Sequence, residues 1–181
     1  RHPEVALDLH FLDSELAYQG VMDGTLEMAI VTLAPHPVEQ LQVVELWRDR
    51  LCFVCAKDHP LAQRSRADDK PLSLAELCEV NCILPGAKTF TRTLIGQRFE
   101  EAGLNLPVSM STNYLETLKM MCGVGLGWSL LPEKMLDSEL VALPVDTAPI
   151  HRPLGYLVHN NRTLSNAARK MIEQLEANRE T

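Results

Sequence analysis

The stretch from residue 113 to residue 132, NYLETLKMMCGVGLGWSLLP, decides the fold of this chain. Apolar residues recur at helical spacing between Leu115 and Cys122, which predicts a helix with one apolar face. Gly123, Gly125 and Gly127 follow, and glycines let the backbone turn sharply and approach another surface closely. The short apolar run that ends at the proline is typical of a buried strand. Two strand–turn–helix units with hydroxyl-rich turns precede this stretch, and that arrangement favours a small-ligand cleft rather than an active site.

Strand and helix patterns alternate along the rest of the chain. Apolar runs or alternating apolar residues predict strands over 5–11, 28–31, 43–47, 51–56, 81–84, 108–111, 140–143 and 154–158. Helical spacing with capping residues predicts helices over 15–22, 91–102 and 165–177. The charged stretch 64–71 is expected to be a mobile loop. Helices alternating with strands favour parallel α/β sheets.

Several short motifs, in order, resemble the effector-binding domain of LysR-type transcriptional regulators. They lie at 2–5 (HPEV), 24–31 (GTLEMAIV), 58–62 (DHPLA), 84–92, 113–132 and 154–159 (LGYLVH). Each motif alone is loose, but their order along nearly the whole chain makes the resemblance specific. It implies a periplasmic-binding-protein-like fold of type 2, with two Rossmann-like lobes joined by two crossover segments.

The resemblance also implies how the chain is divided. Residues 1–48 and 150–181 would form lobe I, and residues 49–149 would form lobe II. In the family, a strand, a hydroxyl-rich loop and a helix come before the first motif, and these are missing here. Lobe I is therefore expected to be incomplete and to lack part of its binding site.

Composition limits the partners of this chain. Its 181 residues carry a net charge of −7, and such a surface does not favour nucleic-acid phosphates, which need clustered Lys and Arg. DNA would be bound only through a helix-turn-helix domain that this chain does not contain. There is no apolar run of about 18 residues, so no membrane span is expected. The five cysteines are an odd number without a disulfide-like spacing, which favours a reduced, cytoplasmic protein.

Hydroxyl and amide side chains are expected where strands end and helices begin. In open α/β sheets, ligands bind beyond the carboxyl ends of strands, and helix N-termini there attract anions. The expected effector-binding residues are Ser14, Thr32, Thr89, Thr91, Arg92, Asn113 and Gly125. Ordinary helix capping is the alternative for Ser14, Thr89 and Asn113. Arg92 could pair with a carboxylate, whereas Lys88 reads as a solvated surface charge.

The cysteines and histidines offer little chemistry. Cys52 and Cys55 form a C-x-x-C pattern on a predicted strand, where residues three apart point to opposite faces, which opposes a shared metal or a disulfide. Burial as small apolar residues is the usual fate of such cysteines, with redox or metal sensing as a minor alternative. His59 lies in the DHPLA turn and is expected to be structural. No nucleophile–base set, phosphate loop or metal motif is present, so we expect no enzyme, no cofactor and no metal.

The function that the resemblance implies is sensing. A small, anionic metabolite would bind between the lobes, and the effector domains would assemble into a homodimer or tetramer. The family's pairing would use residues 5–9 and the helix over 91–102. A periplasmic-type solute-binding protein is the alternative, but the unpaired cysteines and the missing leader argue against it. An enzyme on the same fold is a third possibility that no residue cluster supports.

Overall fold

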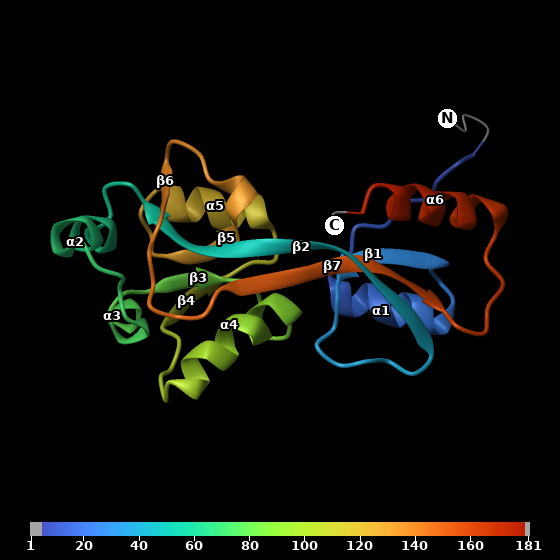
Figure 1. Cartoon of the computed structure of the whole chain (residues 1–181), viewed down its shortest axis with the longest axis horizontal. Helices are drawn as coiled ribbons and strands as arrows, with labels where there is room; N and C mark the ends of the chain where they lie inside the picture. Colours follow the sequence, from blue (N-terminus) through green and yellow to red (C-terminus); the bar gives the residue numbers. More distant parts are fainter. Residues whose placement is uncertain (1–4, 180–181) are drawn as a thin grey trace. The chain divides into compact units, whose positions relative to one another are not determined.

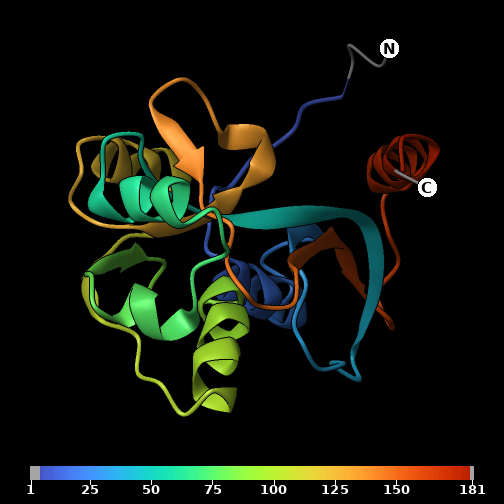
Figure 2. The same cartoon turned by 60° about the vertical axis from the view of Figure 1, so that its left-hand side comes forward.

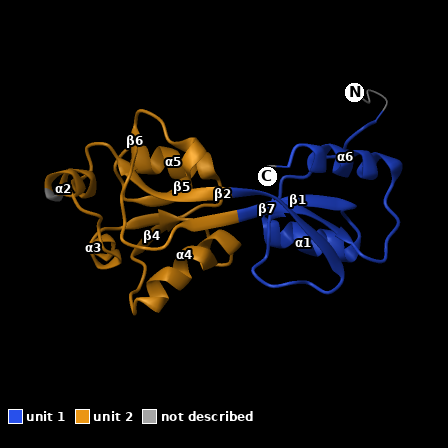
Figure 3. Ribbon diagram, in the orientation of Figure 1, with its two compact units in different colours: residues 1–48, 153–181 blue, residues 49–152 orange. Residues whose placement is uncertain are grey.

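The computed structural model describes residues 5–179, so most of the first motif, 2–5, lies outside it. The chain divides into two compact units, Arg1–Arg48 with Pro153–Thr181, and Asp49–Arg152 (Figure 3). Residues 150–152, which were expected in lobe I, belong to unit 2.

The described residues of unit 1 form two helices and three strand segments. Its elements are α1 (Ser14–Asp23), β1 (Met28–Thr32), the first part of β2 (Leu41–Ala56), most of β7 (Ile150–His159) and α6 (Asn166–Ala177), as labelled in Figure 1. β1 pairs with β7 in antiparallel register, with Ile30 opposite Tyr156. Leu46, Tyr156 and Val158 are buried and pack against Ile172 and Leu175, the apolar face of α6.

Unit 2 contains the remaining elements. They are α2 (Pro60–Asp68), α3 (Leu74–Cys78), β3 (Cys82–Leu84), α4 (Phe90–Glu101), β4 (Val108–Ser111), α5 (Leu115–Gly123), β5 (Ser129–Pro132), a 3-10 turn (Glu133–Met135) and β6 (Leu140–Ala142). β5 and β6 both pair antiparallel with β2, and β3 pairs in parallel with β4. β2 and β7 are the two strands in which the chain passes from one unit to the other.

Helices cover both faces of the strands in unit 2, as both views show (Figures 1 and 2). Leu84 of β3 packs in one apolar cluster with Ile95 of α4, while its neighbour Ile83 packs in another with Leu118 of α5. This division follows from the alternation of side chains along a strand. β3 is fully buried because both of its faces are covered.

Trp128 is the largest fully buried side chain of unit 2. Its ring stacks on Phe99 with centroids 5.9 Å apart and is tilted against Phe53 at 5.7 Å. The indole Nε1–H donates to the carbonyl oxygens of Leu77 at 2.9 Å and Val80 at 3.1 Å. The buried indole N–H therefore has hydrogen-bond acceptors, and its bonds hold the end of α3 against the core.

The helix α2 contradicts the expected mobile loop at 64–71. Its start is set by the His59-Pro60 pair: His59 Nδ1 accepts the Leu61 N–H at 3.2 Å, and proline suits the first helical position. Leu61 and Ala62 are buried beneath the charged face. The charges of α2 thus lie on the outer face of a helix.

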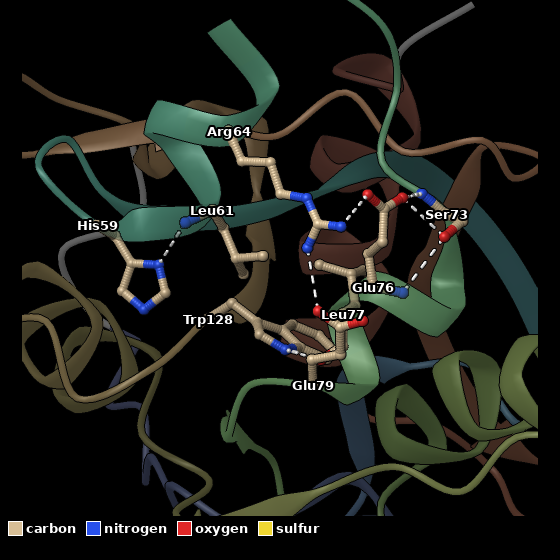
Figure 4. A network of polar contacts seen from close by, with 8 residues as sticks. All are labelled: His59, Leu61, Arg64, Ser73, Glu76, Leu77, Glu79 and Trp128. Atoms are coloured by element: carbon tan, nitrogen blue, oxygen red, sulfur yellow. Dashed lines mark hydrogen bonds and ion pairs between the residues drawn. The ribbon is translucent and has the colours of Figure 1, made fainter. Parts of the chain in front are cut away.

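A capping box marks the start of the short helix α3. Ser73 Oγ accepts the Glu76 N–H, and the Glu76 carboxylate accepts the Ser73 N–H at 2.7 Å (Figure 4). Arg64 joins α2 to this helix through ion pairs of 3.0 Å with both Glu76 and Glu79.

Three predictions about strands were wrong. Residues 5–13 have neither helix nor strand, because no strand pairs with them among residues 5–179. The two strands expected at 43–47 and 51–56 are one continuous strand, β2. The expected parallel sheets are mostly antiparallel: β1 pairs antiparallel with β7, and β5 and β6 pair antiparallel with β2, whereas β3 pairs in parallel with β4.

Candidate functional site

Two of the predicted residues of unit 2, Thr89 and Asn113, meet at Gly86. β3 and β4 run in parallel, and their last residues, Leu84 and Ser111, are partners in the register. The chain leaves β3 into the turn of Gly86, and it leaves β4 towards Asn113. Both turns therefore lie at the same edge of this small sheet, where ligands bind in α/β proteins.

Two side chains hold Gly86 from both sides. Asn113 Oδ1 accepts the Gly86 N–H at 2.9 Å, and Thr89 Oγ1 donates to the Gly86 carbonyl at 2.9 Å. Thr89 Oγ1 also accepts the Arg92 N–H at 3.2 Å and so caps α4, as the capping alternative predicted. The same alternative was wrong for Asn113, because Tyr114 occupies the N-cap position of α5. Asn113 is used across the two turns, 27 residues away from its partner.

Arg92 adds a cation to the first turn of α4. Its Nη1 is buried and finds no hydrogen-bond partner within the described part of the chain. Burial lowers the pKa of the Arg92 guanidinium, with a nearby thiol, Cys82, acting in the other direction. A guanidinium stays protonated in proteins, so a buried, unpaired N–H is a cost that an anionic acceptor would remove. Thr91 is buried on the same turn.

The predicted residues of unit 1 also meet. Ser14, the first residue of α1, accepts the backbone N–H of Thr32 through its Oγ at 3.1 Å. Thr32 is the last residue of β1, and both residues are half-buried. The capping expectation for Ser14 was wrong, because Asp13 is the N-cap residue and Ser14 ties the helix start to the strand end.

Gly125 lies apart from the Gly86 turn. It follows the carboxyl end of α5, whereas Asn113 precedes the amino end of that nine-residue helix. Gly125 is exposed and has φ +84, the left-handed region that favours glycine. Lys88 is exposed, as expected of a solvated charge.

The cysteines are all free thiols. Cys55, Cys82 and Cys122 are buried, and burial raises their pKa to about 11, about 12 and about 12. Cys52 and Cys55 pack into different apolar clusters, as their spacing on the strand predicted. Protonated, buried thiols are poor nucleophiles and poor metal ligands. Within residues 5–179, no group of three or more His, Cys, Asp or Glu side chains could hold a metal ion.

Comparison with known proteins decides the family. The family described as the LysR substrate binding domain matches residues 1–180. This chain belongs to that family. Among curated relatives, the transcriptional regulator CbbR of Xanthobacter flavus is 27% identical over 183 residues, which cover 97% of this chain and 53% of that protein. The regulator YfeR of Shigella flexneri is 26% identical over 172 residues, which cover 93% and 54%. The chain thus spans about half the length of these relatives.

Solved structures of other LysR domains have the same fold, the type 2 periplasmic-binding-protein-like fold. The regulatory domain of Synechocystis CcmR, solved in complex with 2-PG, matches with a TM-score of 0.84 at 20% identity, covering 99% of this chain and 86% of that one. The effector-binding domain of QuiR, solved in complex with shikimate, matches with a TM-score of 0.75 at 16% identity, covering 91% and 76%. No helix in the described part of this LysR domain is long and apolar enough to cross a membrane.

Sequence reasoning missed Gly86 as the centre of the unit 2 group. Gly86 lies in the motif at 84–92, but it is absent from the expected effector-binding residues. The Pro85-Gly86 pair is a turn signal. Such a signal does not show that two side chains from different parts of the chain would hydrogen-bond to the N–H and the carbonyl of the same residue.

Proposed function

We propose that this chain is the sensing part of a LysR-type transcriptional regulator and that it binds a small anionic metabolite at the Gly86 turn. The observation that carries the proposal is the convergence of the Thr89 and Asn113 side chains on Gly86, at the carboxyl ends of two parallel strands and at the start of α4, which carries Arg92 in its first turn. Helix N-termini there attract anions, and Arg92 brings a guanidinium with a spare donor. Gly125 remains a predicted contact that this convergence does not support.

Membership of the family supports the sensing role. The two neighbours named above were solved with small molecules, 2-PG and shikimate, and the curated relatives are transcriptional regulators. We propose that this chain acts in the same way, without catalysis. The whole regulator would work in the cytoplasm, bind DNA through a separate domain, and assemble through its effector domains as a homodimer or tetramer, with residues 5–9 and α4 at the contact.

The test is ligand-induced stabilisation of the 181-residue chain by a panel of organic acids, amino acids and inorganic anions. A ligand at 100 times its dissociation constant raises the free energy of unfolding by about 2.7 kcal/mol. Arg92→Gln should abolish the effect of the anion that binds. Arg98→Gln is the matched control, because it removes the same charge from the same helix. Thr89→Ser should keep binding, since it retains the capping hydroxyl, whereas Thr89→Ala should weaken it.

The Ser14–Thr32 pair is tested on its own. Thr32→Val removes a hydroxyl at the end of β1 but leaves the backbone N–H that Ser14 accepts. Loss of stabilisation in this variant would make unit 1 part of the effector site. If no anion stabilises the chain, or if Arg92→Gln and Arg98→Gln weaken binding equally, the Gly86 turn is not the effector site.

A further inference from the structure

A groove of about 350 Å³ lies in unit 2 on the side of α5 that faces the start of β6. Glu116, Met120 and Gly123 line it from the helix, and their spacing of four and then three residues places them on one face. Glu139 and Leu140 line the opposite wall. The groove shares no residue with the group around Gly86.

Gly123 gives the groove its depth. A Cβ built on this glycine would lie 4.0 Å from both Glu139 Cβ and Leu140 Cδ2, which is ordinary van der Waals contact. Its φ is not in the left-handed region, so a larger residue fits the backbone there. A side chain at position 123 would therefore occupy the groove without straining the helix end.

The groove is acidic. Three carboxylates line it, those of Glu116, Asp137 and Glu139, together with the ammonium group of Lys119. The net charge of these four side chains is −2. Lys119 Nζ and Asp137 Oδ2 pair at 2.8 Å, so those two charges compensate each other. Glu139 meets Lys57 only at 3.8 Å, with both side chains largely exposed. The carboxylates of Glu116 and Glu139 therefore make the charge of the groove negative.

Two large apolar side chains of the groove are exposed. Met120 is 63% exposed and Val124 is 70% exposed, and both line the groove. Adjacent exposed apolar residues on a soluble domain indicate an interaction surface. Methionine suits such a surface because its unbranched side chain adapts to different partners.

We propose that this groove docks a segment of another protein that presents one apolar side chain next to Lys or Arg. The apolar side chain would cover Met120 and Val124, and the basic residue would pair with Glu116 and Glu139. A protein segment fits better than a free cation, because Met120 and Val124 present large exposed apolar side chains within the groove. A small cation would leave those side chains uncovered.

The test uses short synthetic peptides and the isotope-labelled 181-residue chain, followed by NMR. One peptide carries a central leucine between arginines, a second has glutamates in place of the arginines, and a third has serine in place of the leucine. Only the first should shift the amide signals of α5 and of the segment before β6. Its affinity should fall with added salt, since exposed charge pairs are screened.

Variants assign the effect to the groove. Glu116→Gln and Glu139→Gln should each weaken the leucine–arginine peptide roughly two- to fivefold, as exposed ion pairs do. Gly123→Leu should abolish binding by filling the groove, with the thermal midpoint retained. Glu39→Gln, an exposed carboxylate of unit 1, is the charge-matched control. Anion binding at the Gly86 turn should be unchanged in all of them.

Three results would overturn the proposal. The first is the absence of signal shifts with the leucine–arginine peptide at millimolar concentration. The second is equal binding of the serine peptide, which would reduce the interaction to charge alone. The third is binding of arginine amide as tight as that of the peptide, which would make the groove a site for a small cation.

Discussion

The replacement of Gly127 by alanine is expected to destabilise unit 2 more than any other glycine-to-alanine change in the segment 113–132. A Cβ on Gly127 would lie 2.3 Å from the Asn81 carbonyl oxygen and 3.1 Å from its carbon. Real Cβ contacts do not fall below 3.0 Å, so the backbones must separate by at least 0.7 Å, the difference between 3.0 and 2.3 Å. The obstacle is backbone, which cannot rotate away as a side chain can.

That separation acts on two hydrogen bonds and a buried ring. The Trp128 N–H donates to the Asn81 carbonyl at 3.2 Å, and the Ile83 N–H donates to the Trp128 carbonyl at 2.9 Å. Weakening both costs roughly 1–2 kcal/mol, and overpacking around a fully buried Trp128 adds roughly 1–3 kcal/mol. We therefore expect a loss of about 2–5 kcal/mol, a large part of the ~5–15 kcal/mol that stabilises a typical domain.

Two neighbouring glycines provide matched controls. Gly125→Ala meets nothing within 4 Å but must adopt φ +84, which costs roughly 1–2 kcal/mol. Gly123→Ala has ordinary contacts and a normal φ, and it should stabilise the end of α5 by roughly 0.5 kcal/mol. Urea unfolding followed by the fluorescence of Trp128, in a Trp47→Phe background, measures all three. A cost for Gly127→Ala below that for Gly125→Ala would refute the reasoning.

Two further predictions concern buried polar groups. Burial lowers the pKa of His59 below its ordinary 6.5, and its neutral Nδ1 caps α2, so stability should fall as the pH drops below about 6.5 towards the lower folded pKa. His59→Asn keeps a capping acceptor and should remove this part of the pH dependence of the urea midpoint. Asp49 and Arg152 pair at 2.6 Å with side chains only 14% and 12% exposed, so Asp49→Asn should cost roughly 2–4 kcal/mol. Asp49→Leu with Arg152→Met should recover most of that loss, and a double-mutant cycle would contradict the pairing if the two changes were additive.

Local patterns predicted the elements whose causes are local. α5, β5 and β4 were expected close to their observed positions because helical spacing and buried apolar runs suffice to define them. The cap of α4 by Thr89 follows from side-chain chemistry within one turn. Charge alone predicts a loop at 64–71, but the His59-Pro60 pair starts a helix there, and its apolar residues Leu61 and Ala62 are buried.

Long-range partners explain the other differences. The two predicted strands, 43–47 and 51–56, left residues 48–50 outside both, yet β2 continues through them. Asp49 is satisfied by Arg152, which lies 103 residues further along the chain at the other crossing. Strand direction and the use of Asn113 at Gly86 depend in the same way on distant segments. Spacing within a window of ten or twenty residues cannot contain that information.

One helix connects the two proposals. Asn113, just before α5, holds the Gly86 turn, while Gly123, at the end of α5, opens the acidic groove. Leu118 and Cys122 fix the helix between them to the core on its buried face. If an anion at the Gly86 turn displaces α5, it must also change the groove, and a peptide in the groove must then change anion affinity by the same factor. Equal anion affinity with and without the leucine–arginine peptide would show that α5 stays in place and that the two sites act independently.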